Sequence, residues 1–355
     1  MKMVSTERRG IVTGGTWCAD HNKFVSHWPG EEELVEILKN EVRGGGSACN
    51  LAIDMKRLDP ELPVSTIGLV GDDEDGRILV AEADAVGIDR SHLIIAEQGR
   101  TSHTDAFTSA KTGRRTHLYI PGTAAELTPD HFDFSQVGAR ILHLGLPGVH
   151  PRLDAPWDSD ANGWVTVLKK ARAEGIATNL ELCSIPAERI ATIIRPCLAH
   201  LDLLVVNDYE IAAIAGHETG HGSSVDADQC MKAALHVLNE GSMQLVVAHF
   251  PTGAVAVDAN GTKYSRTSVD IPRDEIKGTN GAGDAFAAGL LYGLHQEWNV
   301  EAALELGHAS AAASVRGLGT TDTVVSWSDC LELASSWGWR SSFRKTLTTD
   351  TVQFR

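Results

Sequence analysis

The stretch from Lys277 to Leu294 reads K-G-T-N-G-A-G-D-A-F-A-A-G-L-L-Y-G-L, a glycine-rich turn that runs into an Ala-rich, apolar segment. The apolar segment predicts a helix. Gly281 and Gly283 would let backbone N–H groups converge at its positive end without obstruction by Cβ atoms, which predicts an anion-binding site. Asp284 falls in the first helical turn, where the helix dipole favours a carboxylate, so we expect it to be ionised at neutral pH.

This pattern suits phosphoryl transfer. An Asp so placed can orient an attacking hydroxyl and accept its proton, while backbone amides and Mg²⁺ carry the developing charge. The simpler alternative is a helix that begins after glycine and uses Asp284 only as a cap or dipole partner. A Walker A loop is excluded, because Arg77 and Ile78 follow the glycines of G-D-D-E-D-G-R-I. Gly44 to Cys49 does not complete G-x-G-x-x-G, which disfavours a Rossmann dehydrogenase.

Outward from this motif, short apolar runs alternate with segments of helical periodicity. We expect strands at residues 10–13, 64–69, 140–144, 176–182, 201–206 and 245–248. Crossover helices are expected at residues 162–174 and 228–240, where apolar residues recur at helical intervals and Gly follows. This alternation is typical of an α/β fold with a largely parallel central sheet.

Two regions break the alternation. Thr104 to Ile120 contains two β-like runs around Lys111-Thr112-Gly113, and Val255 to Tyr264 has the same design around Asn260-Gly261. Both predict antiparallel hairpins. The first hairpin lies between parallel units, so we expect it to leave the main sheet, joined by Trp17 to Arg43, and to form a lid.

The expected organisation is one domain over residues 10–325, with lid segments at about 17–43 and 103–120 inserted in it. Residues 326–355 should form a C-terminal helix and a tail whose last ten residues are disordered.

The bulk composition narrows the function. The chain has 355 residues, of which 43% are hydrophobic and 22% charged, as in ordinary globular proteins. A net charge of −16 argues against a nucleic-acid partner, which would require clustered Lys and Arg. The six cysteines form no C-x-x-C pair, which fits reduced thiols in the cytoplasm. The start lacks the apolar core of a signal peptide, and no stretch approaches the roughly 18 apolar residues of a membrane span.

Two further stretches provide context for the glycine turn. Residues 43–52 read R-G-G-G-S-A-C-N-L-A, and residues 67–79 read I-G-L-V-G-D-D-E-D-G-R-I-L. Together with G-T-N-G-A-G-D-A-F, they resemble the signature regions of the ribokinase-like (PfkB) carbohydrate kinase family over roughly residues 10–321. The resemblance implies a ribokinase-like three-layer α/β sandwich with a small β-sheet lid. It also implies ATP-dependent phosphorylation of a hydroxyl on a small sugar or sugar-like substrate.

The resemblance also implies site residues. It makes Asp284 the catalytic base and the turn Gly281, Ala282 and Gly283 the anion hole. The positions that match the family's sugar-binding residues are Asp20, Gly45, Gly46 and Asn50. Those that match the nucleotide side are Asn207, Gly253, Thr279 and His308. Glu210, in V-N-D-Y-E, matches a residue that acts on Mg²⁺, which it would reach mainly through water. The implied cofactors are ATP and Mg²⁺.

This chain departs from the family at several positions. Gly278 stands where the family usually has an Asp that helps to hold a monovalent cation, which leaves potassium dependence open. On the nucleotide side, Ala248 to Gly253 replaces the usual T-x-G-x-x-G, and His308 replaces an Asn. On the acceptor side, Cys18, Ser47 and Gly145 replace an Asn, a Lys and a Glu of ribokinase. The acceptor therefore stays open between sugars and nucleosides.

Several alternatives remain at this point. A non-catalytic protein could keep the fold to sense a nucleotide or a sugar, and a homodimer could form through the lid. Arg100, His103 and Arg115 suit either an acidic substrate or a solvated surface. His143 and His150 flank the end of a strand, where a buried, hydrogen-bonded His is expected more than a metal ligand.

Overall fold

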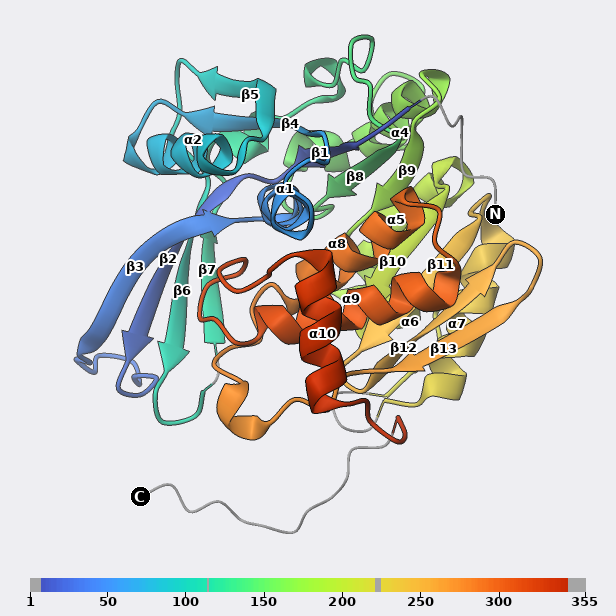
Figure 1. Ribbon diagram of the computed structural model, residues 1–355. Helices are drawn as coiled ribbons and strands as arrows, with labels where there is room; N and C mark the ends of the chain where they lie inside the picture. Colours follow the sequence, from blue (N-terminus) through green and yellow to red (C-terminus); the bar gives the residue numbers. More distant parts are fainter. Residues whose placement is uncertain (1–7, 114, 221–224, 344–355) are drawn as a thin grey trace.

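The computed structural model describes residues 8–113, 115–220 and 225–343. A nine-stranded sheet forms its centre (Figure 1). In spatial order the strands are β13 (Lys263–Thr267), β12 (Gly253–Asp258), β11 (Leu245–Phe250), β10 (Leu203–Asn207), β9 (Ala177–Leu180), β8 (Ile141–Gly145), β1 (Ile11–Gly15), β4 (Val64–Gly71) and β5 (Asp89–Ala96). In this spatial order, all strands from β11 to β5 run parallel to one another, whereas β12 and β13 form an antiparallel hairpin at one edge.

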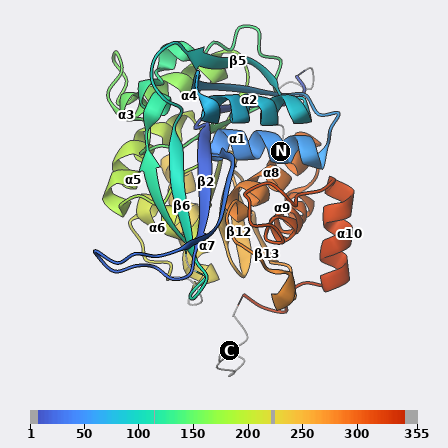
Figure 2. The same cartoon turned by 90° about the vertical axis from the view of Figure 1, so that its left-hand side faces the viewer.

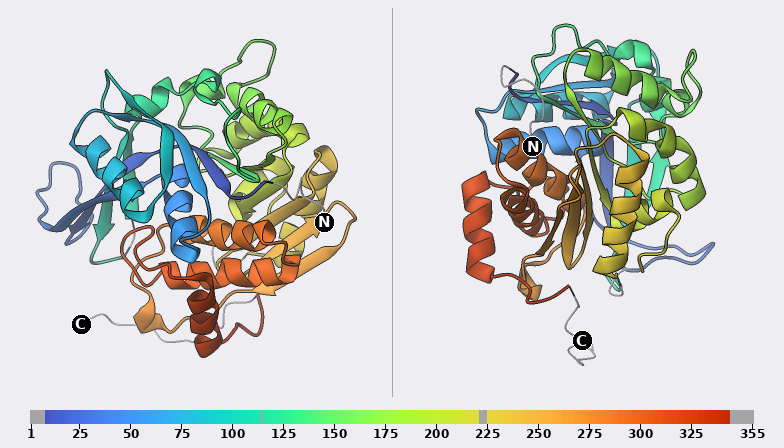
Figure 3. Two further views of the ribbon diagram at one scale, coloured as in Figure 1. Left: turned by 45° about the horizontal axis from the view of Figure 1, so that its top comes forward. Right: turned by 90° about the vertical axis from the view of Figure 1, so that its right-hand side faces the viewer.

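Helices cover both faces of this sheet and give three layers (Figure 3). One face carries α1 (Ser47–Leu58), α2 (Glu74–Val86), α8 (Ala282–His295), α9 (Val300–Ser314) and α10 (Trp327–Trp337). The other face carries α3 (Pro151–Asp154), α4 (Gly163–Ala173), α5 (Ala187–Ile194), α6 (Asp208–Ala215) and α7 (Ala227–Glu240). Strand residues alternate between the two apolar cores, as Leu203 and Leu204 do. The predicted three-layer α/β sandwich is confirmed.

A second, four-stranded sheet stands beside the carboxyl ends of the central strands (Figures 1 and 2). Its order is β3 (Ile37–Gly45), β2 (Cys18–Val25), β6 (His103–Ser109) and β7 (Arg115–Ile120). Strand β2 pairs antiparallel with β3 and parallel with β6, and β6 pairs antiparallel with β7. The hairpin expected around residues 111–113 is thus confirmed, and so is the hairpin at Asn260-Gly261, which joins β12 to β13.

The expected helices begin at side-chain caps. The Asn162 side-chain oxygen accepts a hydrogen bond from Val165 N at 3.0 Å at the start of α4. Asp226 accepts two backbone N–H groups at the start of α7. These caps satisfy N–H groups that have no partner within the helix, which fixes where each helix begins.

The C-terminal segment returns to the edge of the central sheet. After α10, Trp339 forms a β-bridge with Val269, and the Arg266 guanidinium lies 4.1 Å from the centre of the Trp339 ring. Residues 344–355, including the last ten, which we expect to be disordered, lie outside the described residues. Within the described ranges, every helix is too short or too polar to cross a membrane.

Candidate active site

The predicted glycine turn opens α8 at the carboxyl edge of the central sheet. Gly281 adopts a left-handed conformation with φ of 75°, and a Cβ atom built there would lie 2.3 Å from the Thr320 carbonyl oxygen. Only glycine fits such a position without a shift of the backbone. Gly283 has more room, since its nearest neighbour would be His249 Cε1 at 3.5 Å. The turn therefore packs against residue 320 and directs the N-terminus of α8 toward an open cavity.

That cavity has a volume of about 530 Å³ and lies between the two sheets. Its walls come from β2, β7, α1, α8, the ends of β9 and β10, and the loop after β8. Seven of the predicted site residues line it: Asp20, Gly46, Asn50, Asn207, Glu210, Gly283 and Asp284. Residues spread over some 260 positions of sequence are thus brought to one hollow, as expected for the carboxyl edge of an open α/β sheet.

The other predicted residues lie at different distances from the cavity. Gly45 lies against Asp20, where a Cβ atom would come within 2.6 Å of the carboxyl group. Thr279 is exposed and precedes Asn280, which lines the cavity. Gly253 and His308 are not among its lining residues.

Aromatic rings surround those last two positions. A Cβ atom on Gly253 would lie 2.5 Å from the Phe343 ring, and Phe343 packs edge-on against Phe250. His308 is 4% exposed and packs on Phe286, whose ring centre lies 4.9 Å away. Burial lowers the pKa of His308 to about 3, so its ring is neutral.

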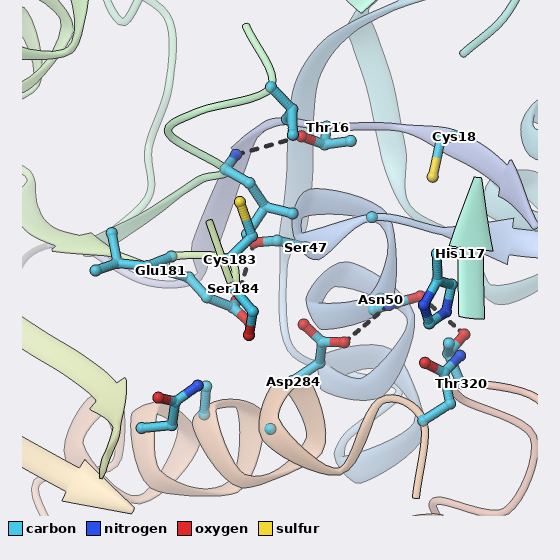
Figure 4. Close-up of a pocket in the computed structure, with 18 of the residues that line it drawn as sticks. Thr16, Cys18, Ser47, Asn50, His117, Glu181, Cys183, Ser184, Asp284 and Thr320 are labelled. Carbon is cyan, nitrogen blue, oxygen red and sulfur yellow. Dashed lines mark hydrogen bonds between the residues drawn. The ribbon is translucent and has the colours of Figure 1, made fainter. Parts of the chain in front are cut away.

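Asp284 is held by a chain of hydrogen bonds (Figure 4). The Asn50 side-chain N–H donates to the Asp284 carboxyl at 2.9 Å, and the Thr320 hydroxyl donates to the Asn50 side-chain oxygen at 2.9 Å. The Asn50 amide, whose oxygen faces Thr320, thus presents its N–H and not its carbonyl oxygen to the Asp284 carboxyl. Three segments far apart in sequence therefore position one carboxyl group.

A second carboxyl group, Glu181, lies beside Asp284. The two share a hydrogen bond. Glu181 also accepts a hydrogen bond from the Ser47 hydroxyl at 2.9 Å, and its Oε2 lies 2.7 Å from His143 Nε2. Sequence reasoning missed Glu181, although it directly follows the buried strand Ala177–Leu180. Polar residues at the carboxyl ends of parallel strands are the signal that could have found it.

Burial dominates the electrostatics of the cavity. Burial raises the pKa of Asp284 well above its usual range, and the neighbouring Glu181 carboxyl raises it further. Desolvation therefore opposes the helix dipole, which was expected to keep Asp284 ionised. Burial also raises the pKa of Asp20 to about 6 and that of Glu210 to about 7. The cavity thus concentrates carboxyl groups that bind protons near neutrality.

Asn207 and Glu210 form a capping box at the start of α6. The Asn207 side-chain oxygen accepts from Glu210 N, and the Glu210 carboxyl accepts from Asn207 N, both at 2.9 Å. The cap interpretation of this pair is confirmed. Both residues also line the cavity, so the same box directs them toward any ligand.

Of the basic and histidine residues considered near the small sheet, Arg115 and His103 contact protein groups, whereas Arg100 is exposed. Arg115 donates to the Asn22 side-chain oxygen, and the Arg115 charge lowers the pKa of Asp20 against the larger effect of burial. His103 stacks on His21 with ring centres 5.1 Å apart.

The two histidines near the end of β8 are fully buried. His143 bonds to Ser47 and Asn179, and His150 bonds to Thr16 and to the Ala124 carbonyl oxygen. The prediction of buried, hydrogen-bonded histidines is confirmed. Across the residues that the structure describes, no group of three or more His, Cys, Asp or Glu could hold a metal ion.

The chain is similar to known proteins in family, in sequence and in fold. The model described as "pfkB family carbohydrate kinase" matches residues 9–327. The 5-dehydro-2-deoxygluconokinase of Geobacillus thermodenitrificans is 27% identical over 325 residues, which cover 88% of this chain and 89% of the relative. The ATP-dependent ribose-1-phosphate kinase of Halopiger xanaduensis is 27% identical over 323 residues, 89% of this chain and 97% of the relative.

The fold also matches solved structures. The crystal structure of ribokinase from Thermotoga maritima superposes with a TM-score of 0.74 over 92% of this chain and 99% of that chain. The sequence identity is 22%, so this likeness is one of fold.

Proposed function

This chain belongs to the PfkB family of carbohydrate kinases, and from that premise we propose that Asp284 is the base of its phosphoryl transfer. The chain is an ATP-dependent kinase of a sugar or sugar-like substrate. One observation carries the assignment of the base. Asp284 faces the cavity from the first turn of α8, directly after the Gly281 turn.

The proposed reaction follows from this arrangement. Ionised Asp284 accepts the proton of the acceptor hydroxyl as the hydroxyl oxygen bonds to the γ-phosphorus of ATP and the bond from that phosphorus to ADP breaks. The first N–H groups of α8 have no partner within the helix, so the turn Gly281 to Gly283 supplies donors for the phosphoryl oxygens. The helix N-terminus supplies positive potential that the net charge of −16 does not.

The described residues fit Mg²⁺ held mainly through water. Mg²⁺ keeps several waters and takes few carboxylate ligands besides substrate phosphates, so the Glu210 carboxyl and the Asn207 amide, which both line the cavity, fit such a site. Glu210, with Asn207 beside it, would hold the ion. When bound there, Mg²⁺ would neutralise charge on the phosphates.

Asp20 and Asn50 are the proposed acceptor ligands. Both side chains are buried beneath the cavity surface, and Asp20 lies against Gly45. A carboxyl and an amide together accept and donate hydrogen bonds, which suits neighbouring hydroxyl groups of a sugar or a nucleoside ribose. Ser47 and Cys18 line the same wall, so they would shape the choice of acceptor.

Coupled ADP release tests the proposed function. The full chain with MgATP should turn over at least one member of a panel of sugars, sugar acids, sugar phosphates and nucleosides. ATP binding with no turnover across the panel would instead favour a protein that senses its ligands.

We also propose that two copies of the chain form a homodimer through the small sheet. On β7, His117 and Tyr119 line the cavity, whereas Leu118 and Ile120 alternate to the opposite face and are about half exposed. A second copy would cover these apolar side chains. Sedimentation should detect a dimer that Leu118→Lys dissociates; a monomeric wild-type chain would refute the dimer without affecting the kinase assignment.

A further inference from the structure

The cavity holds two carboxyl groups in direct contact. Asp284 comes from the first turn of α8 and Glu181 from the end of β9, and they share a hydrogen bond. Two carboxylates at hydrogen-bond distance repel strongly, so the pair retains one proton when no ligand separates them. The proposed reaction uses only Asp284, which leaves Glu181 without a role.

Burial raises the pKa of Glu181, whereas the groups that form hydrogen bonds to it favour its ionised form. The Ser47 hydroxyl donates to Glu181 Oε2 at 2.9 Å, and His143 Nε2 lies 2.7 Å from the same oxygen. On the far side of the ring, the Asn179 side-chain N–H lies 3.0 Å from His143 Nδ1. That N–H occupies Nδ1 as an acceptor, so the neutral ring carries its hydrogen on Nε2, which lies 2.7 Å from Glu181 Oε2 and 2.9 Å from Ser47 Oγ. Burial, which lowers the pKa of His143 to about 4, keeps the ring neutral.

The proton of the pair therefore lies on Asp284. Glu181 has two donors within hydrogen-bond distance, whereas Asp284 receives one N–H, from Asn50. A carboxylate with more donors holds its charge more readily. In the free enzyme Asp284 then donates its hydrogen to Glu181, and a group that carries a proton cannot act as a base.

We propose that Glu181 is a positioning residue that keeps a proton on Asp284 until the acceptor enters, so that the base is freed only in the presence of acceptor. The proposal rests on the assignment of Asp284 as the base. Glu181 does not contact the phosphoryl group in this scheme; it acts through Asp284.

The protons balance over one cycle. When the acceptor hydroxyl takes the place of Glu181 as the partner of Asp284, the proton of the pair leaves to solvent through the open cavity. Asp284 then accepts the hydroxyl proton as the new oxygen–phosphorus bond forms and the bond to ADP breaks. The proton on Asp284 is again shared with Glu181, which restores the starting pair. One proton is released for each phosphoryl group transferred.

Other ionisable groups act on Asp284 from the surrounding elements. They are Cys18 and Asp20 on β2, Cys49 and Asp54 on α1, His143 on β8 and Glu210 on α6. After burial, the charge and the hydrogen bond of Glu181 are the largest influences on the pKa of Asp284. A change confined to Glu181 should therefore dominate the titration of the base.

This arrangement has a consequence for water. A kinase whose base is always ionised can activate water in place of its acceptor and hydrolyse ATP without product. With Asp284 protonated in the free site, a water molecule that takes the place of the acceptor finds no ionised Asp284 to accept its proton. Glu181 would thus limit ATP hydrolysis in the absence of acceptor.

Glu181→Gln tests the proposal because glutamine keeps the shape of the side chain and removes its charge. The probe is MgATP without acceptor, followed by ADP release from pH 5 to 9. Loss of the neighbouring charge lowers the pKa of Asp284. The acid limb of the variant's pH–rate profile, where activity falls at low pH, should therefore move to lower pH by about one unit or more. ADP release at neutral pH should rise several-fold. The acid limb of kcat/KM should shift likewise with any acceptor that the panel shows to be active.

Glu181→Asp is the matched control. It retains the charge, so its acid limb should stay near that of the wild type even if the shorter side chain lowers the rate. A Gln variant whose profile superimposes on the wild type would overturn the proposal, since a purely structural role would leave the profile unmoved.

If the Gln variant does not fold, the pH–rate profile of the wild-type enzyme provides an independent test. Its acid limb should lie above the ordinary aspartate pKa of about 3.9, and an acid limb near 4 would contradict the proposal. Asp284→Asn separates the two hypotheses. Full activity of that variant would remove the base itself, whereas an inactive Asp284→Asn with an unshifted Glu181→Gln would remove only the role of Glu181.

Discussion

The residues proposed for the acceptor and those predicted for the nucleotide have different surroundings. On the acceptor side, polar side chains at strand ends and on α1 are fixed by hydrogen bonds, as Asn50 is by Thr320. On the nucleotide side, the predicted residues are an exposed loop position, Thr279, and two positions packed among aromatic rings, Gly253 and His308. One side presents side chains that are already oriented, and the other presents mainly a helix terminus and backbone.

This difference shows where specificity can reside. Preorganised side chains lose little entropy on binding and discriminate between ligands by their hydrogen bonds. A helix N-terminus binds any phosphate chain in much the same way. The identity of the acceptor should therefore depend on individual side chains, whereas ATP binding should tolerate substitutions that keep the turn before α8 intact.

The largest expected effect is on the chemistry at the junction of the two sides. Asp284→Asn keeps the shape of the side chain and the contact with Asn50 but cannot accept a proton. We expect kcat to fall by about 10²- to 10⁴-fold, the usual contribution of a general base, with little change in ATP affinity. Coupled ADP release and an ATP titration measure the two quantities. Wild-type kcat in the variant would exclude Asp284 as the base.

A pair of glycine variants tests the nucleotide side. Gly281→Ala places a methyl group at a positive φ and 2.3 Å from the Thr320 oxygen, so the turn or residue 320 must move. Because Thr320 orients Asn50 and hence Asp284, we expect kcat to fall by about 10²-fold, the typical cost of a displacement of about 1 Å. Steady-state kinetics and a melting curve measure the result.

Gly283→Ala is the matched control, because its methyl group would meet no atom closer than 3.5 Å. It should fold with wild-type stability and lose less activity than Gly281→Ala. Equal losses of activity in the two variants would mean that the turn needs open space at both glycines. The left-handed backbone at Gly281 would then not be the reason for the loss.

A substitution on the acceptor side should change KM for the acceptor substrate. When ionised, the buried Asp20 carboxylate can only accept hydrogen bonds. Asp20→Asn replaces it by an amide that fits the same space beside Gly45. Loss of one hydrogen bond to a charged group costs about 1.5–3 kcal/mol, so KM for the acceptor should rise about ten- to a hundredfold. KM for ATP should stay near the wild-type value, as measured by titrating each substrate in turn. A rise in KM for ATP alone would place Asp20 on the wrong side of the cavity.

The sequence predicted the layers better than the contacts. Buried strands such as Leu203–Asn207 have continuous apolar runs, which identify a parallel core strand directly. Strand β5 was missed because its residues are mostly exposed or half-buried at the sheet edge, so it has no such run. Turn residues at positions 111–113 identified the hairpin of the small sheet, since that signal is local.

Residues of the candidate site could be predicted only where they stand in a recognisable sequence motif. Asp284 and Asn50 stand in recognisable glycine-rich stretches. Glu181 has no motif: it meets Ser47 and His143 through the register of β8 and β9, in which His143 pairs with Asn179. No pattern in the sequence could show that Phe343, 90 residues away, packs against Gly253, because that contact depends on the return of the C-terminal segment.

The smallest expected effect concerns a carboxyl group that borders the acceptor side without lining it. Asp54 follows Asn50 by one turn of α1, is 0% exposed, and has no hydrogen-bond partner among the described residues for either oxygen. Burial raises its pKa well above the usual range, which leaves the folded state holding a proton that the unfolded chain releases above a pH of about 3.9. Stability from this group is therefore present at low pH and is lost as the pH rises toward the raised value.

Asp54→Ala should remove that loss. We expect the free energy of unfolding at pH 8 to rise by about 1–3 kcal/mol, the cost of one unsatisfied buried polar group, with a smaller gain at pH 5. Denaturant unfolding at the two pH values measures the difference, and kcat and both KM values should not change. Destabilisation of similar size at both pH values would show that Asp54 packs as a neutral part of the core. A change in kcat would show that carboxyl groups outside the cavity also tune the base, so that the acceptor side extends one helical turn deeper than its lining residues.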